Sequence, residues 1–273
     1  MTEEIGILLK TYQDLKLDEV LDHQKFNEYA IVHHSTGMEG SSLTETETRL
    51  LLDENLTPKG KPLEHSLMVK DHFEALQFTL QAAAEKQPIT TAFIQVLNAH
   101  VMKNTGGFYE TAFGRIDGTN GSFRKANVTA GGRYFPGYDK VEGYTNQLVK
   151  NVNDNLPLRQ TQEDQLTLSF SAHYDLVRIH PFYDGNGRTS RLLMTYIQSL
   201  YKLPLSIVFQ EDKQEYLDAL RSSDAGESNQ PFTDFMYKQY RKQLTQEIEA
   251  YNVAMKKDIP PKNKRGIKYS IFF

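Results

Sequence analysis

The chain has 273 residues, of which 31 are Lys or Arg and 35 are Asp or Glu, so its formal net charge is −4. Its 39% hydrophobic and 24% charged residues are typical of a globular protein with a sizeable core. The lack of Cys excludes disulfides, thiolate catalysis and cysteine-based metal sites. The mildly acidic charge disfavours nucleic-acid binding, and no apolar run approaches the ~18 residues of a membrane span. Because the first residues are acidic where a signal peptide is basic, we expect a cytoplasmic protein without membrane partners.

Helical periodicity dominates the first hundred residues, where apolar residues recur at spacings of three and four. Thr44 and Glu47 have the Ser/Thr-x-x-Glu spacing of a capping box, which predicts a helix start before the apolar run 50–52. The other helices predicted here cover residues 5–20, 24–34, 63–86 and 90–100, the last of them capped by Thr90.

The pattern changes between Gly106 and Tyr138, where eight glycines and several aromatic residues replace the helical period. The pair Gly131-Gly132 separates two short β-prone runs and predicts a β-hairpin. Helices are predicted again over residues 140–152, 161–179, 188–201, 214–221 and 232–255. The predicted fold class is therefore mainly α, with one small inserted hairpin.

One stretch between two predicted helices, residues 180–191, reads His-Pro-Phe-Tyr-Asp-Gly-Asn-Gly-Arg-Thr-Ser-Arg. Gly185 and Gly187 allow the backbone to approach a ligand closely. Their N–H groups and the free donors of the following helix start suit an anion. Asn186 adds a side-chain donor. This stretch therefore has the elements of an anion cradle.

The same stretch supplies charge and a base. Arg188 and Arg191 lie three apart on the first helical turn, so both can face one side and grip a polyphosphate. Asp184 is a hard oxygen ligand suited to Mg²⁺. His180 titrates near neutral pH and can accept a proton from a hydroxyl. Each part alone has a plainer structural interpretation, but together they favour a site for a phosphate, a metal and a base.

Residues 180–191 resemble the signature of Fic-domain proteins, His-Pro-Phe-x-Asp/Glu-Gly-Asn-Gly-Arg-x-x-Arg, at every specified position. Most members transfer AMP from ATP to a Ser, Thr or Tyr hydroxyl of a protein and release pyrophosphate. The resemblance implies a Fic-type helical bundle divided into an N-terminal helical region (1–85), a Fic core (86–210) with a flap hairpin (121–139), and C-terminal helices with a basic tail (211–273).

The resemblance also implies roles for single residues. His180 would be the general base, and Asp184 would bind Mg²⁺ at the α- and β-phosphates. The phosphate-binding residues that it implies are Gly185, Asn186 and Gly187 as an anion hole, with Arg188 and Arg191 at the β- and γ-phosphates.

The predicted flap and one tyrosine outside the core complete the site. Family members align target proteins by strand addition to the flap, so Tyr134 and Phe135 are expected to clamp the target backbone near His180. The alternative is a plain surface hairpin packed on the core. Tyr216 resembles a tyrosine that lies near the adenine, for which base stacking and core packing are the two interpretations.

A second motif lies upstream, where residues 35–40 read Ser-Thr-Gly-Met-Glu-Gly. It resembles the inhibitory signature Ser/Thr-x-x-x-Glu-Gly/Asn of class II Fic proteins. The resemblance implies that Ser35, Glu39 and Gly40 belong to an inhibitory segment, and we expect Glu39 to pair with Arg191. Gly37 departs from many relatives and is expected to weaken the inhibitory helix by up to ~1 kcal/mol.

The remaining features carry less chemistry. His173 and His100 are expected to make structural hydrogen bonds, because no His-Glu-x-x-His pattern supports zinc. The basic tail, residues 256–268, is interpreted as solvated, with a weak contact to an acidic partner as the alternative.

The sequence therefore predicts a self-inhibited protein adenylyltransferase that uses ATP and Mg²⁺ and modifies an unidentified protein or itself. Two alternatives lie within the same superfamily: transfer of another phosphate-linked group, and removal of AMP, in which Glu39 would orient a water. A third is a non-enzymatic nucleotide-binding module, against which the intact His180 and Asp184 argue. Homodimer formation stays open.

Overall fold

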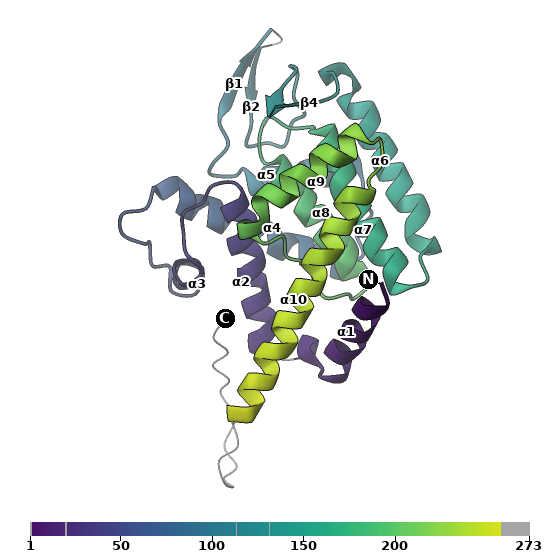
Figure 1. Cartoon of the computed structure of the whole chain (residues 1–273). Coiled ribbons are helices and arrows are strands. Elements are labelled where there is room, and N and C mark those ends of the chain that lie inside the picture. The colour runs from purple at the N-terminus through teal and green to yellow at the C-terminus, as the bar shows by residue number, and fades with distance from the viewer. Residues whose placement is uncertain (1, 20, 113, 131, 258–273) are drawn as a thin grey trace.

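The computed structural model describes residues 2–257 apart from residues 20, 113 and 131, and it is mostly helical (Figure 1). The first five helices are α1 (Thr2–Asp14), α2 (Leu21–Met38), α3 (Glu45–Glu54), α4 (Leu63–Ala84) and α5 (Thr91–Val101). The other five are α6 (Val141–Asn155), α7 (Gln162–Ile179), α8 (Asn186–Leu200), α9 (Lys213–Ala225) and α10 (Gln230–Lys257). The predicted mainly α class is confirmed.

Local capping fixes several helix starts. Thr44 Oγ1 accepts a hydrogen bond from the Glu47 N–H at 3.2 Å, and a Glu47 carboxylate oxygen accepts one from the Thr44 N–H at 2.8 Å. This is the predicted capping box. Thr90 likewise caps α5 by accepting from the Phe93 N–H at 3.0 Å. The first helix ends earlier than predicted, because Lys16 adopts a positive φ of 52° and turns the chain.

Two antiparallel hairpins lie between α5 and α6: β1 (Phe108–Thr111) with β2 (Gly114–Asp117), and β3 (Thr129–Ala130) with β4 (Arg133–Tyr134). The second is the predicted hairpin, with Thr129 paired to Tyr134; part of its glycine turn lies outside the described residues. The first was not predicted. Its strands bury only Ile116, so the sequence lacks the alternation that indicates a strand.

Helix α8 lies at the centre of the bundle, and its side chains are buried around the whole circumference. One hydrophobic cluster packs α8 against α4 and α5, and includes Ile31 and Leu97. The other joins α1, α7 and α10 through Leu9, Phe170 and Tyr240. The first cluster mixes residues from either side of the predicted boundary near 85, and the second mixes residues from either side of both boundaries, near 85 and 210. The N-terminal helices therefore share their cores with the rest of the bundle.

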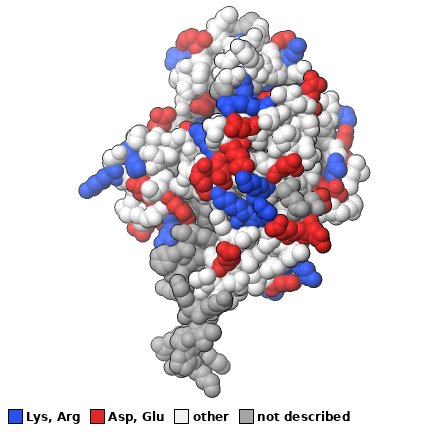
Figure 2. Space-filling model, viewed as in Figure 1, with Lys and Arg blue, Asp and Glu red and all other residues white. Residues whose placement is uncertain are grey.

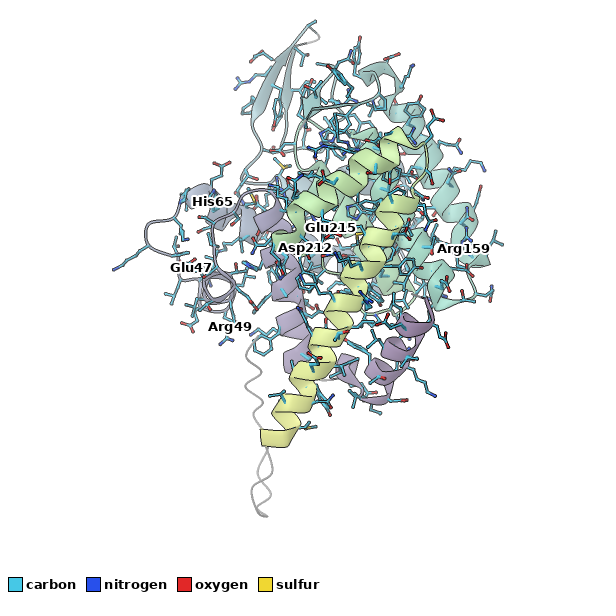
Figure 3. All side chains as sticks on the ribbon, viewed as in Figure 1. Glu47, Arg49, His65, Arg159, Asp212 and Glu215 are labelled. Atoms are coloured by element: carbon cyan, nitrogen blue, oxygen red, sulfur yellow. The ribbon has the colours of Figure 1, made fainter. Side chains whose placement is uncertain are left out.

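Ion pairs join α10 to the start of α9 and to the residues just before it. Figure 2 shows acidic side chains gathered beside basic ones on this face, and Figure 3 labels two of them, Asp212 and Glu215. Lys242 bridges Glu211 and Asp212 at 2.8 Å, and Lys238 reaches Glu215 at 2.7 Å. Such surface pairs each contribute little, but together they hold the segment that contacts α2.

None of the helices in the described part of the chain is long and apolar enough to cross a membrane. The predicted basic tail begins at the end of α10, and residues 258–268 of it lie outside the described residues.

The capping box gives a direct test of local stability. Thr44→Ala removes the side-chain acceptor of the Glu47 N–H, so we expect the free energy of unfolding to fall by about 1 kcal/mol. Thr46→Ala, an exposed change inside the same helix, should alter it by less than about 0.5 kcal/mol. Urea denaturation of both variants measures the difference, and equal effects would contradict the capping assignment.

Candidate active site

The loop between α7 and α8 brings two helix ends together. His180 is the C-cap of α7 and adopts the left-handed conformation, with φ 52° and ψ 59°. Gly185, with φ 76°, is the N-cap of α8, and a Cβ there would lie 2.7 Å from the Met102 sulfur. The loop thus turns sharply at both ends, and only glycine fits at the second turn.

The His180 imidazole lies under the flap. The Phe135 ring stacks on it with the ring centroids 3.8 Å apart and the planes 12° from parallel. Burial, followed by the charges of Arg124 and Arg133, lowers the pKa of His180 to about 4. The expectation of titration near neutral pH is therefore wrong: desolvation and two guanidinium groups disfavour the imidazolium. The imidazole is neutral at pH 7 and can accept a proton.

Asn186 makes side-chain hydrogen bonds within the loop that were not predicted. Its Oδ1 accepts from the Phe182 N–H, and its Nδ2 donates to the Phe182 carbonyl, both at 2.9 Å. The side-chain amide is therefore engaged within the loop, and the backbone N–H of Asn186 belongs to the open start of α8. Asn98 on α5 braces the same loop by donating to the Asp184 carbonyl at 3.0 Å.

The N-terminus of α8 is open to an anion. No side chain caps this end, and the first N–H groups of a helix have no acceptor within the helix. They carry partial positive charge and point toward any ligand there. Gly187 keeps the surface clear: a Cβ at this position would lie 2.5 Å from the Glu39 carboxylate. Glu39 therefore occupies the place where a phosphate would approach.

Arg188 is a buried cation, 2% exposed, beside that helix end. Its guanidinium donates to the Val101 carbonyl at 3.3 Å and to the Met102 sulfur at 3.2 Å. Its Nε has no hydrogen-bond partner among the described residues. The closest carboxylate oxygen paired with it is that of Asp184, at 3.8 Å. A buried guanidinium with such weak acceptors favours an incoming anion.

Arg191, one turn further along α8, is fully engaged by the predicted inhibitory segment. Its Nε donates to Ser35 Oγ at 2.7 Å, and its Nη2 donates to the Ser35 carbonyl at 3.0 Å and to Glu39 Oε1 at 2.6 Å. The predicted contact between Glu39 and Arg191 is present. Burial raises the pKa of Glu39, but Arg191 and Arg188 outweigh it and hold that pKa below its ordinary value.

The end of α2 presents Glu39 to the arginine. The Ser41 N–H donates to the Thr36 carbonyl at 3.1 Å, and the Gly40 N–H donates to the Gly37 carbonyl at 3.0 Å. Gly40 has φ 100°. This is a Schellman helix end with Glu39 at the C-cap and glycine at the left-handed position. The motif therefore fixes Glu39 by backbone geometry as well as by charge.

Gly37 lies where the inhibitory helix α2 comes close to the side chain of Gln210. A Cβ there would collide with the side chain of Gln210, whose Nε2 lies 2.7 Å from His33 Nε2. Helix α2 continues without interruption through this glycine to Met38. The expected weakening of the helix was based on the low helix propensity of glycine alone. In the structure, Gly37 is the position at which the segment before α9 approaches α2.

Tyr216 belongs to the core in this structure. It is 4% exposed, its hydroxyl lies 3.1 Å from His173 Nε2, and its ring packs edge-on against Phe232. The ring therefore packs in the core in the described state. His173 makes the expected structural hydrogen bond, whereas His100 stacks on Phe78 with centroids 4.5 Å apart.

Arg124, which the sequence analysis did not single out, fastens the flap to the loop. It is 1% exposed and donates to three carbonyls, those of His180 at 2.8 Å, Ala126 at 2.9 Å and Pro136 at 2.5 Å. Its backbone N–H also donates to the Pro181 carbonyl at 2.9 Å. The base of the flap and the histidine are thus held by one buried cation.

A second arginine anchors the flap to α9. Arg133 donates to Asp224 at 2.8 Å, and Asp224 also accepts from the Tyr174 hydroxyl at 3.0 Å. Phe135 lies inward on His180, whereas Tyr134 is 89% exposed. The two predicted clamp residues therefore differ: one covers the histidine and the other faces solvent. No local sequence pattern marks Arg124 or Arg133, because their partners are distant in sequence.

Asp184 is the carboxylate of the loop that a metal would use. Its side chain is 57% exposed, and its Oδ1 accepts from the Gly185 N–H at 2.5 Å, which leaves Oδ2 facing outward from that contact. No group of three His, Cys, Asp or Glu side chains suited to a metal occurs among the described residues. The site therefore fits a cation that takes one protein carboxylate and the oxygens of a bound phosphate.

Residues 88–198 match the profile of the Fic/DOC family. The chain contains a Fic domain. The protein adenylyltransferase Fic of Drosophila grimshawi is 29% identical over 207 residues, covering 75% of this chain and 40% of that protein. The protein of the same name from Drosophila melanogaster is 28% identical over 206 residues, covering 75% and 39%. The chain thus spans about 40% of the length of these curated relatives.

Solved structures share the fold. A Fic-domain-containing signaling protein from Bacteroides thetaiotaomicron aligns with a TM-score of 0.77 and 24% identity, covering 92% of this chain and 98% of the other. A fragment of Fic-1 from C. elegans aligns with a TM-score of 0.75 and 23% identity, covering 92% and 73%. At these identities the likeness concerns the fold, and it agrees with the predicted Fic-type bundle.

The buried Arg124 allows a test of how this Fic domain holds its loop. Arg124→Met leaves three carbonyls without their donor, so we expect the free energy of unfolding to fall by about 3 kcal/mol. Arg115→Met, in the exposed strand β2, should change it by less than about 0.5 kcal/mol. Removal of the positive charge should also raise the pKa of His180, which NMR titration measures. An unchanged pKa would contradict the contact.

Proposed function

We propose that this Fic domain transfers AMP from ATP to a Ser, Thr or Tyr hydroxyl of a protein and releases pyrophosphate. The observation that carries the proposal is the convergence of a neutral imidazole, His180, and two buried guanidinium groups, Arg188 and Arg191, on the uncapped N-terminus of α8. The names of the curated relatives support the same activity.

The chemistry follows from charge and position. Neutral His180 accepts the proton of the target hydroxyl, whose oxygen attacks the α-phosphorus while the bond to pyrophosphate breaks. The N–H groups at the start of α8 and the guanidinium groups of Arg188 and Arg191 stabilise the negative charge on the phosphate oxygens. Asp184 would hold Mg²⁺, which neutralises phosphate charge when bound.

Glu39 makes the described state an inhibited one in this proposal. Its carboxylate takes the Arg191 donor that a γ-phosphate needs, and it lies over Gly187 at the phosphate-binding helix end. ATP that binds beside it would have its phosphates displaced from line with the incoming hydroxyl. A misplacement of ~1 Å can reduce the rate by ~10²-fold.

The base role is tested with His180→Asn, because asparagine tolerates the left-handed conformation but is not a base. ATP binding should change little, whereas transfer of label from α-labelled ATP should fall by at least ~100-fold. With the parent chain, the low pKa of His180 predicts that the rate is retained through pH 6 and falls only as the pH approaches about 4, where the imidazole becomes protonated. Substantial residual transfer by the variant would reject this role.

Inhibition is tested with Glu39→Gly in the full chain. The change frees Arg191, so adenylylation, including self-modification, should rise by about tenfold or more. Glu39→Gln keeps the size but removes the charge and should give an intermediate rise. Arg191→Ala combined with Glu39→Gly should show no rise, because the freed donor is gone.

Three other outcomes of these assays support other functions. Glu39 lies near enough to His180 to act on it electrostatically, and a carboxylate beside the base could orient a water. Loss of AMP release from a modified protein in Glu39→Gly would therefore support removal of AMP. Transfer of label from the γ-phosphate would support another group transfer, and nucleotide binding without any transfer would support a binding module.

A further inference from the structure

A groove runs between α6 and α7 and begins at the flap. Two hollows of about 330 and 390 Å³ lie between these helices and share Leu148, Asn151 and Asp175. The first hollow reaches Pro136, the last residue before the flap rejoins the bundle. The second extends to Arg159, labelled in Figure 3 beside the end of α6. The two hollows therefore form one continuous groove.

The lining of the groove suits a peptide. Its floor is apolar, with buried side chains that include Leu148, Val152, Ala172 and Ile179. One rim carries the exposed Tyr144 and amide side chains of α6. An apolar floor with amide groups along its edge can hold the side chains and backbone of a bound segment at once.

Asp175 places a carboxylate beside this apolar floor. Its carboxylate is only partly exposed, and within the described part of the chain it accepts no hydrogen bond and forms no ion pair. Burial raises its pKa to about 6, and the charge of Arg178 lowers it only in part. The other titratable or charged groups that line the groove are Tyr144 on α6 and Arg159 beyond it. A partly desolvated carboxylate of this kind gains free energy from an external cation.

The groove ends beside the proposed active site, because Pro136 and Ile179, which line it, are the chain neighbours of Phe135 and His180. Pro136 at its near end follows Phe135, which stacks on His180, and Asp175 lies about one helical turn before His180 on α7. A segment that lies in the groove therefore leads directly to the flap and the base. This adjacency favours, as the occupant, a segment of the protein whose hydroxyl is modified.

We propose that the α6–α7 groove binds a segment of the target protein and that Asp175 selects a Lys or Arg side chain in that segment, close in sequence to the modified hydroxyl. The inference rests on the proposed function. It makes Asp175 a specificity-determining residue outside the phosphate site, and it makes the target a protein with a basic side chain beside its acceptor.

The test uses a positional library of short peptides around one fixed Ser, Thr or Tyr acceptor. In the Glu39→Gly chain, AMP incorporation should select Lys or Arg over norleucine at one position by about 5-fold or more. Asp175→Asn should abolish this selection, and Asp175→Lys should replace it with selection for Asp or Glu. Asp154→Asn, an exposed change on α6 outside the groove, is the matched control and should retain it.

Binding of the same fluorescent peptides to the unmodified chain, without ATP, separates the groove from the chemistry. Binding of the basic peptides should be tight at about pH 7.5 and weaken at about pH 5, where the Asp175 carboxylate becomes protonated. Basic selection in binding without AMP transfer would retain the groove and reject the proposed function. Transfer without basic selection, selection that survives Asp175→Asn, or no selection in either assay would overturn the groove proposal.

Discussion

The guanidinium of Arg191 requires an anion, and this requirement organises the site. The side chain is 5% exposed, so water cannot satisfy its donors. In the described state Ser35 and Glu39 satisfy them from α2, more than 150 residues away along the chain. A phosphate would satisfy the same donors as well. Under the proposed function, Glu39 and a phosphate would therefore compete for this arginine.

Backbone geometry makes that competition direct. Gly40 ends α2 in the left-handed conformation and presents Glu39 at the helix C-cap. Gly187 leaves the start of α8 without a Cβ, so the carboxylate can reach the helix end. Gly37 lets the segment before α9 press against α2 and hold it. Gly37 and Gly187 remove a side chain where two parts of the chain meet, whereas Gly40 supplies the left-handed turn that ends α2.

The sequence predicted what depends on local spacing. The capping threonines follow from the residues beside them. The pair of Glu39 and Arg191, by contrast, was expected from the resemblance of two distant motifs to Fic signatures. The side-chain contacts of Asn186 were not predicted, because both partners are backbone groups of Phe182 and only the folded loop brings them within reach. Arg124 was not found because its carbonyl acceptors come from both sides of the flap and from the α7 end. Single-sequence patterns do not encode such long-range contacts.

Two arginines that hold the flap also act on the base, His180. Arg124 and Arg133 both lower the pKa of His180, and both hold the flap, one at its base and the other at Asp224. Any movement of the flap that removes Phe135 from the imidazole therefore also changes the field at that ring. A target segment that lifts Phe135 would bring its hydroxyl to a ring that burial, Arg124 and Arg133 keep neutral, so that the ring nitrogen can accept the proton.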